Sequence, residues 1–344
     1  MRRPGESIRS RQLFASIVIV GVIVACDSTA VSPGEHGVDG LTQAPARQFS
    51  AWSAPISVEG IPGTHTDFNT AALEGCPFIS PDGKTFYMAS NRTGTLGGLD
   101  IWASTRPSVN AGWGEPKNVG APVNSTADDF CPTIARDGHL FYFVSRRSGG
   151  CGLGDIYVTR LRDDGEFDEP ELLPCDATAP YDAVNSPFDE FSPFPVNDFG
   201  AGPVLYFSSF RPGGYASEAP GANADSDVYV SASDGGVFGT PALVAAVNTD
   251  ADDGQPNVSS DGLELYFYST RVIPGASGAA DLYVATRSSP SAPWLPPTNL
   301  GAIVNSAAGE TRPSLSWDRT ALYFGSTRTG GEGMSDIYVT TRTR

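Results

Sequence analysis

The chain has 344 residues, of which 18% are charged and 10% are aromatic, and its formal net charge at pH 7 is −17. A surface this acidic repels the phosphates of nucleic acids and of anionic lipids, which excludes nucleic acid as a partner. A cationic partner or bound cations are favoured instead.

The first 25 residues predict a lipoprotein signal peptide. Four arginines up to Arg11 precede the apolar run "LFASIVIVGVIVAC". This run is too short to span a bilayer, which needs roughly 20 apolar residues, but it is typical of a secretory signal. The residues from Ile23 to Cys26 resemble a bacterial lipobox. Cys26 is therefore expected to carry the lipid, with an ordinary signal peptide as the alternative.

The localisation and the domain boundaries follow from this reading. A lipidated Cys26 would anchor the chain in the bacterial envelope, facing the periplasm or the cell surface. Asp27 resembles an inner-membrane retention signal of enterobacteria, and this signal does not decide between the membranes in other lineages. Residues 26–48 are rich in Gly, Pro, Ser and Thr and predict a flexible tether. Residues 49–344 are expected to form the folded domain.

The folded part repeats one sequence unit five times. Each copy opens with a proline before a short apolar run, and the period is 55 to 63 residues. The five prolines are Pro77, Pro132, Pro193, Pro256 and Pro313.

Each unit predicts four strands. The first follows the proline and ends in a turn such as Pro81–Gly83, and the second is an aromatic-rich run such as Thr85–Met88. The third begins at an aspartate, as in "DIYVT", and the fourth follows an aromatic-x-x-Pro signature such as Trp113 to Pro116. No window of helical period and length occurs in residues 49–344, so the domain is expected to be all-β.

Five such units predict a five-bladed β-propeller of four-stranded blades. A lone four-stranded meander leaves both faces apolar, and radial stacking of the copies buries these faces. The aromatic-x-x-Pro signature already occurs at Trp52, before the first complete unit, whereas only "RTR" follows the last third strand. The strand near Trp52–Val58 is therefore expected to be the outer strand of the last blade and to close the ring.

The repeat resembles the WD40-like β-propeller repeat of TolB-type periplasmic proteins and bacterial lipoproteins. The pattern "P-x-x-S-x-D-G…LYF-x-S-x-R…G-G-x-G…D-I-Y-V" carries the resemblance from about residue 50 to residue 344. The third copy departs from it with "NDFGAGPVLYF", and the fifth has Arg319 where glycine is usual. The resemblance implies a binding or scaffold module without catalytic activity.

Four polar positions are the same in every copy. A carboxylate stands three residues before each proline: Glu74, Asp129, Glu190, Asp253 and Glu310. An asparagine precedes it by five residues: Asn69, Asn124, Asn185, Asn248 and Asn305. An arginine ends the second strand: Arg92, Arg147, Arg211, Arg271 and Arg328. An aspartate opens the third strand: Asp100, Asp155, Asp227, Asp281 and Asp336.

Antiparallel strand order places these groups on one face, so two carboxylates are expected around each arginine. We call the carboxylates before the prolines the channel-mouth carboxylates. One interpretation is a ring of acidic groups that binds a cation or a basic peptide, with the channel-mouth carboxylates as the contacts. The other is structural, because each arginine can satisfy its carboxylates by charge-assisted hydrogen bonds. The arginines and the strand-three aspartates are expected to be structural in either case.

Few residues suggest catalysis or a cofactor. Of three histidines only His65 is expected on the carboxylate face, and no Gly-x-Ser-x-Gly elbow occurs. The loops Asn248–Gly254 and Asn223–Asp227 alternate oxygen ligands as calcium loops do, but the first lacks the usual glycine and a bidentate glutamate in register. No metal or other cofactor is therefore expected, with calcium as the exception to consider.

Two functions remain open at this point. The first is a non-catalytic, monomeric scaffold for an envelope protein or a glycan. The second is a glycosidase-like enzyme that uses the channel-mouth carboxylates, which would need unlike environments to act as acid and base. Their near-equivalence by repetition favours the scaffold, so the chain is not expected to be an enzyme.

The loop between strands two and three of the third blade is the longest of its kind, "PGGYASEAPGANADS". Loops on a rigid scaffold carry recognition, so Tyr215, Glu218 and Asp225 are candidate contacts. The four cysteines after Cys26 predict two disulfides in an oxidising compartment. Cys151 and Cys175 lie at neighbouring strands, and Cys76 and Cys131 occupy equivalent places in adjacent blades.

Overall fold

A computed structural model of the protein describes residues 49–196, 202–215 and 225–344. The predicted signal peptide, the tether and Cys26 lie outside the described residues. Within the described ranges, no helix is long and apolar enough to cross a membrane.

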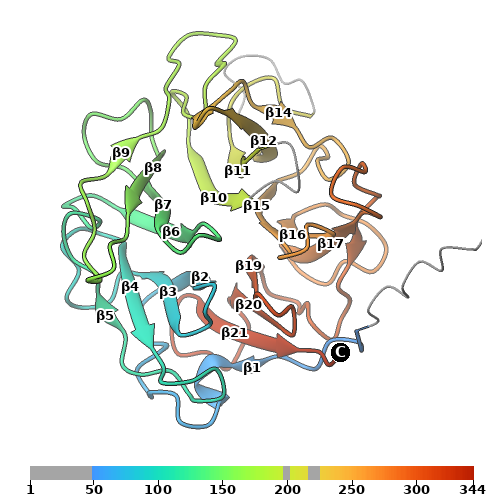
Figure 1. Cartoon of the computed structure of the whole chain (residues 1–344). Coiled ribbons are helices and arrows are strands. Elements are labelled where there is room, and N and C mark those ends of the chain that lie inside the picture. Colours follow the sequence, from blue (N-terminus) through green and yellow to red (C-terminus); the bar gives the residue numbers. More distant parts are fainter. Residues whose placement is uncertain (1–48, 197–201, 216–224) are drawn as a thin grey trace, which may run out of the picture. The chain divides into compact units, whose positions relative to one another are not determined.

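Five antiparallel sheets surround a common centre, which confirms the predicted five-bladed β-propeller (Figure 1). Blade one contains β2 (Glu74–Ile79), β3 (Thr85–Ser90), β4 (Asp100–Thr105) and β5 (Lys117–Asn118). Blade two contains β6 (Asp129–Ile134), β7 (Leu140–Ser145), β8 (Asp155–Arg160) and β9 (Glu171–Leu172). Blade four contains β15 (Asp253–Val258), β16 (Glu264–Ser269), β17 (Asp281–Thr286) and β18 (Thr298–Asn299).

Blade three has one strand more than the others. It contains β10 (Glu190–Val196), β11 (Val204–Ser209), β12 (Asp227–Asp234), β13 (Val237–Phe238) and β14 (Ala242–Leu243). The long β12 pairs first with β13 through a tight turn at two glycines and then with β14, which is the expected outer strand.

Blade five is completed from the N-terminal side, as the signature at Trp52 predicts. It contains β19 (Glu310–Leu315), β20 (Ala321–Ser326), β21 (Asp336–Thr341) and β1 (Ile56–Ser57), and one 3-10 turn, η1 (Val58–Gly60), follows β1. Ile56 lies opposite Val339 and Ser57 opposite Tyr338, so the blue β1 lies beside the red β21 in Figure 1. The first and last segments of the domain therefore share one sheet and close the ring.

Every first strand bulges at its proline. The pairing register shifts within β2, β6, β10, β15 and β19, because proline has no N–H to give to the ladder. The residue before each proline has a positive φ of 48° to 58°. These residues are Cys76, Cys131, Ser192, Gln255 and Arg312. Their side chains line a cavity at the centre of the ring, together with the prolines.

Aromatic side chains fill the spaces between the blades. Phe86 of β3 lies edge-on to Trp113 at 5.2 Å and to Tyr323 of blade five at 5.3 Å, between ring centroids. Tyr87 makes the same kind of contact with Phe141 of blade two. These rings are buried, so radial stacking removes both faces of each sheet from water, as the repeat predicts.

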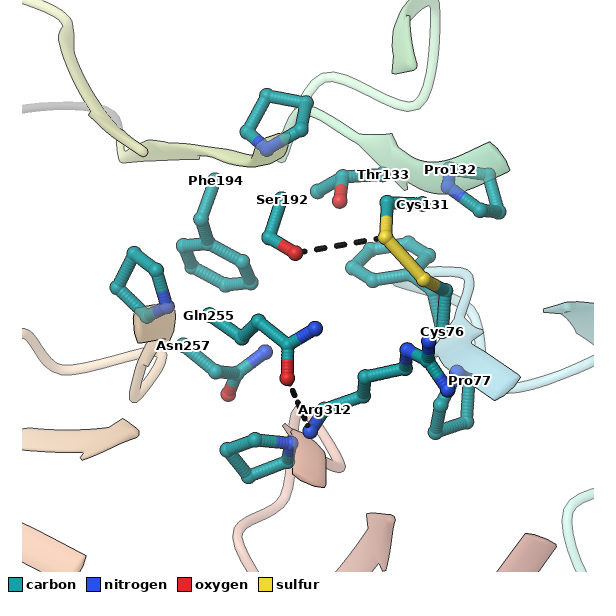
Figure 2. Close-up of a pocket in the computed structure, with 14 residues that line it drawn as sticks. Cys76, Pro77, Cys131, Pro132, Thr133, Ser192, Phe194, Gln255, Asn257 and Arg312 are labelled. Atoms are coloured by element: carbon teal, nitrogen blue, oxygen red, sulfur yellow. Dashed lines mark hydrogen bonds between the residues drawn. A yellow bond between two sulfur atoms is a disulfide. The ribbon is translucent and has the colours of Figure 1, made fainter. Parts of the chain in front are cut away.

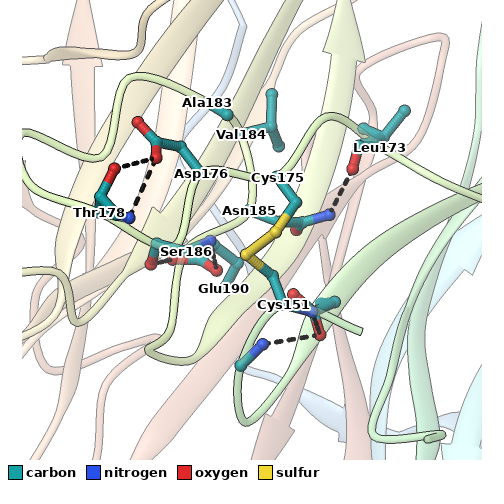
Figure 3. The surroundings of a disulfide bond; sticks show 12 residues. Cys151, Leu173, Cys175, Asp176, Thr178, Ala183, Val184, Asn185, Ser186 and Glu190 are labelled. Atoms are coloured by element: carbon teal, nitrogen blue, oxygen red, sulfur yellow. Dashed lines mark hydrogen bonds between the residues drawn. A yellow bond between two sulfur atoms is a disulfide. The ribbon is translucent and has the colours of Figure 1, made fainter. Parts of the chain in front are cut away.

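The structure holds both cysteine pairs as disulfides. Cys151 and Cys175 join the loop before β8 to the segment after β9, with Cα atoms 5.8 Å apart (Figure 3). Cys76 and Cys131 join the first strands of blades one and two, with Cα atoms 4.7 Å apart. The bulges bring the second pair within bonding range, because they turn both side chains toward the same central cavity.

Candidate functional site

The channel-mouth carboxylates are buried, and each one pairs with the arginine of its own blade. The five carboxylate side chains have no exposed surface, and arginine Nη2 lies 2.5 to 3.2 Å from the nearest carboxylate oxygen. In blade one, Glu74 also accepts hydrogen bonds from Thr70 and Ser90. Both carboxylate oxygens of Glu74 thus accept hydrogen bonds although burial removes them from water.

The arginines are held by rings as well as by charge. In blade two the Arg147 guanidinium carbon lies 5.3 Å from the ring centroid of Phe143 and 5.1 Å from that of Tyr157. The same arginine donates to the carbonyl groups of Pro122 and Val123 in the loop before β6. Each arginine therefore fixes the loop that enters its blade.

The expectation that two carboxylates surround each arginine is wrong. The aspartates that open the third strands accept hydrogen bonds from backbone N–H groups of the preceding loop instead, and no described ion pair joins them to an arginine. Asp100 accepts from Leu96 and Gly97, and Asp155 accepts from Cys151 and Gly152. The glycine-containing loop between the second and third strands folds back over the aspartate. Its backbone N–H groups therefore donate to the carboxylate in place of the arginine.

The repeated asparagines connect neighbouring blades. Asn124 accepts a hydrogen bond from the backbone N–H of Ile101 and donates one to its carbonyl, so it pairs with β4 as a strand would. Asn69 does the same with Ile337 of blade five and thereby adds to the closure of the ring. The hydrogen-bonding groups of these side chains are therefore used within the fold.

The picture of an open acidic ring therefore needs correction. A carboxylate without exposed surface cannot contact a partner, and it cannot act as a catalytic acid or base on a glycan while an arginine holds it. In the loop Asn248–Gly254, Asn248 is bonded to Val228 and Asp253 to Arg271. Among the described residues, no group of three or more His, Cys, Asp or Glu could hold a metal ion.

The candidate contacts in the blade-three loop are only partly described. Tyr215 is 52% exposed, and its backbone N–H donates to Asp227. Asp225 is described, whereas Glu218 and part of the calcium-like loop Asn223–Asp227 lie outside the described residues. A role of this loop in recognition stays a prediction.

A groove in blade one offers the open, polar site that the channel mouth does not. It has a volume of about 390 Å³ and lies beside Arg92. Its wall includes Asp67, Thr70, Trp102 and Glu115, and we call it the blade-one groove. Asp67 and Glu115 are exposed, and neither carboxylate has a hydrogen-bond or ion-pair partner in the part of the chain that the structure describes. Trp102 is 8% exposed, and its Nε1 has no described partner.

Arg92 links this groove to the structural network. Its Nη1 donates to the carbonyl of Asp67 at 2.9 Å and its Nη2 to the carbonyl of Phe68 at 2.7 Å. The guanidinium carbon lies 5.3 Å from the centroid of the Trp102 ring. The same arginine thus positions the carboxylate-bearing loop and the indole that line the groove.

Two of the groove residues, Trp102 and Asp67, depart from the repeat, and this signal was available in the sequence. Trp102 stands where the other four blades have tyrosine: Tyr157, Tyr229, Tyr283 and Tyr338. Asp67, two residues before the asparagine, stands where they have no carboxylate: Pro122, Ala183, Ala246 and Ile303. The length of its loop made blade three the predicted site of recognition, whereas the side chains that depart from the repeat, Asp67 and Trp102, lie in blade one.

A second acidic group contacts the segment that follows Asp67. Glu59 of η1 accepts hydrogen bonds from the backbone N–H groups of Phe68 and Asn69. Burial, together with a hydrogen bond to and repulsion from Glu332, raises the pKa of Glu59 to about 7. Burial likewise raises the pKa of Glu190 to about 7 and that of Asp227 to about 6.

We expect the melting temperature to fall as the pH rises from about 5 to 8. The folded state keeps protons on these three carboxyl groups at pH values where the unfolded chain has released them, so stability decreases through this window. Glu59→Gln should make the fall shallower, as followed by thermal unfolding at constant ionic strength. A melting temperature that rises over this range would contradict the assignment.

Comparison with known proteins identifies the fold. No protein-family model matches the chain, and no curated protein matches it. A thermostable family-43 glycoside hydrolase matches with a TM-score of 0.50 and 15% identity, over 82% of this chain and 92% of that one. An exo-1,5-alpha-L-arabinanase from a bovine ruminal metagenomic library matches with a TM-score of 0.50 and 11% identity, over 81% of this chain and 100% of that one. A TolB structure from Agrobacterium tumefaciens has a TM-score of 0.44 and 16% identity, over 84% and 88% of the two chains.

These matches overturn the expectation that the chain is not an enzyme. That expectation rested on the near-equivalence of the channel-mouth carboxylates and on the resemblance to propellers that serve as binding and scaffold modules. Glycoside hydrolases share the architecture over the whole of their own length or nearly so. At these identities the likeness establishes the fold, and a function has to be argued from the site.

Proposed function

We propose that the protein is a carbohydrate-active enzyme that binds its glycan in the blade-one groove. The observation that carries the proposal is the combination in one open groove of an indole ring and two carboxylates without described partners, Trp102, Asp67 and Glu115. The shared fold with glycoside hydrolases supports it as context.

The chemistry of the groove suits a sugar. Its volume lies in the range of small-molecule sites, which combine an aromatic wall with a few polar groups. Carboxylate oxygens accept hydrogen bonds from sugar hydroxyl groups, and the guanidinium of Arg92 keeps their loop in place. Glycoside hydrolysis uses a pair of carboxylates at the scissile bond, and Asp67 and Glu115 are the pair that the groove offers.

The proposal predicts that hydrolysis depends on both carboxylates. Purified protein is incubated with a panel of envelope and plant polysaccharides, and newly formed reducing ends are measured. Asp67→Asn and Glu115→Gln should each lower the rate at least about a hundredfold, since each removes an acid or base at little cost in shape.

Blade two supplies the matched control. Glu169 occupies in blade two the position of Glu115 in blade one and is also exposed. Glu169→Gln should leave the rate unchanged. If the panel yields a substrate whose hydrolysis is insensitive to Asp67→Asn and Glu115→Gln, the groove is not the active site.

We also propose that the enzyme works in the bacterial envelope as a lipoprotein of the WD40-like propeller kind. The support is sequence alone: the basic and apolar N-terminal segment, the lipobox-like residues that end at Cys26 and the repeat pattern. We expect the mature protein to partition into detergent and Cys26→Ser to release it or leave it uncleaved, as judged by fractionation and mass spectrometry. An unmodified mature N-terminus downstream of Cys26 would contradict the anchor.

A further inference from the structure

The cavity at the centre of the propeller carries a charged group that the groove does not use. Arg312 precedes the proline of β19, and its side chain extends across the ring toward Cys76 and Pro77 of blade one (Figure 2). A Cβ atom added to Gly75 would clash with its Nη1, so the guanidinium packs directly against the backbone of β2. Arg312 thus spans the junction between the last and first blades from inside the channel.

The guanidinium of Arg312 lacks an acceptor in the described part of the chain. No described carboxylate lies within ion-pair distance of it, and no described oxygen accepts a hydrogen bond from it. Its Nε is buried without a partner, and burial lowers its pKa from the ordinary value. An arginine stays protonated in proteins, so a positive charge sits here without compensation. The five repeated arginines differ from Arg312, because each of them pairs with a buried carboxylate. These are Arg92, Arg147, Arg211, Arg271 and Arg328.

The neighbouring polar groups also present donors to the cavity. Gln255 uses its Oε1 to accept a hydrogen bond from the backbone N–H of Arg312 at 2.7 Å, which leaves its Nε2 as a donor. Asn257 uses its Oδ1 to accept from the backbone N–H of Leu315 at 3.0 Å, which leaves its Nδ2 as a donor. Both residues line the cavity, and neither amide nitrogen has a hydrogen-bond acceptor among the described residues (Figure 2). The orientation of both carboxamides follows from the backbone N–H groups that they accept from.

We propose that this cavity binds a small monovalent anion, namely chloride, held by Arg312, Gln255 and Asn257. The guanidinium has a buried Nε without a partner and no counter-ion among the described residues, and an anion beside it would compensate the charge and accept from that Nε. The remaining lining consists of proline rings, Phe78, Phe194 and the Cys76–Cys131 disulfide, which favours a weakly hydrated ion. The chain carries a net charge of −17, so only a local positive charge would retain an anion here.

The size of the cavity selects a small ion. It offers about 30 Å³, and a single water needs roughly 10 to 15 Å³ on this scale, so a halide fits and a sugar acid does not. The anion would connect blades one, four and five at the closing junction of the ring. Binding is therefore expected to stabilise the folded domain.

The test is the melting temperature at constant ionic strength as chloride replaces gluconate. Each tenfold increase in chloride above its dissociation constant should raise the melting temperature of the full chain by roughly 3 °C. Arg312→Met should abolish this dependence because it removes the charge. Gln255→Glu should abolish it too, because the new carboxylate occupies the place of the anion, and this variant should melt at least as high as the wild type in gluconate.

A crystal grown in bromide gives an independent readout, since an anomalous peak is expected between Arg312, Gln255 and Asn257. The proposal is overturned if the melting temperature does not respond to chloride, or if it responds equally in the wild type and in Gln255→Glu. Absence of bromide from the cavity would also overturn it. None of these results depends on a glycan, so the anion site and the groove are tested separately.

Discussion

Replacing Glu74 with glutamine is expected to lower the free energy of unfolding by about 3 to 5 kcal/mol. Glu74 has no exposed surface, and it accepts from Arg92, Thr70 and Ser90. Glutamine keeps the shape of the side chain but leaves the charge of Arg92, which is 9% exposed, without its counter-ion. Burying one charge alone costs far more than the pair does.

A surface arginine provides the comparison for this measurement. Arg146 is 46% exposed and bridges Asp128 and Asp189 at 3.3 and 3.2 Å. Because water screens exposed pairs, Arg146→Met should cost no more than about 1 kcal/mol. Urea unfolding at pH 8 measures both variants. Equal losses in Glu74→Gln and Arg146→Met would mean that the buried network is not what stabilises the blade.

Removing the disulfide between Cys76 and Cys131 is expected to have an effect of similar size. The bridge closes a segment of 55 residues and ties the first strands of blades one and two together at the central cavity. The loss of this constraint on the unfolded chain corresponds to about 4 kcal/mol for the double change to serine. The bridge between Cys151 and Cys175 closes 24 residues, so its loss should cost less, about 3 kcal/mol.

The order of the two losses is the informative result. It is measured as the free energy of unfolding of the two double serine variants under oxidising conditions. A larger loss for Cys151 and Cys175 than for Cys76 and Cys131 would show that native-state contacts, rather than the length of the closed segment, determine the contribution of each bridge.

The architecture could be predicted from the sequence because its signals are local and repeated. The turn at Pro81–Gly83 and the aspartate that begins β4 recur in further copies, and the early signature at Trp52 predicts the strand that closes the ring. Local patterns of this kind predict the sheets correctly, because each strand pairs with the next strand in the sequence. The glycine-like turn of the fifth copy also forms, with Arg319 at a φ of 64°.

The partners of the repeated polar groups could not be predicted from a shared face. Ser90, two residues before Arg92, lies opposite Asp100 in the sheet, but the backbone N–H groups of Leu96 and Gly97 donate to Asp100 and no ion pair with Arg92 forms among the described residues. Which donor reaches a carboxylate depends on how the loop folds back, and sequence spacing contains no information on that. The bulges also limit prediction. The alternation of side chains along a strand does not indicate that Arg312, at the bulge of β19, faces the central cavity.

The blade-one groove combines segments that lie far apart in the chain. Asp67 precedes β2, Trp102 lies in β4 and Glu115 precedes β5, so no single motif contains the site. The departures of Asp67 and Trp102 from the repeat are visible in an alignment of the five copies. Their meeting in one groove depends on the fold of the blade and on Arg92, which holds the loop of Asp67.

The affinity for an oligosaccharide of the hydrolysed polysaccharide tests the central claim most directly. It is measured by titration calorimetry with the wild type and with the double variant Asp67→Ala, Trp102→Tyr, which restores residues that other blades carry at these positions and should therefore fold. We predict that the double variant binds at least about tenfold more weakly, a loss of roughly 1.4 kcal/mol, while Glu169→Gln binds as the wild type does. Equal affinities of the wild type and the double variant would contradict the assignment of the blade-one groove as the carbohydrate site.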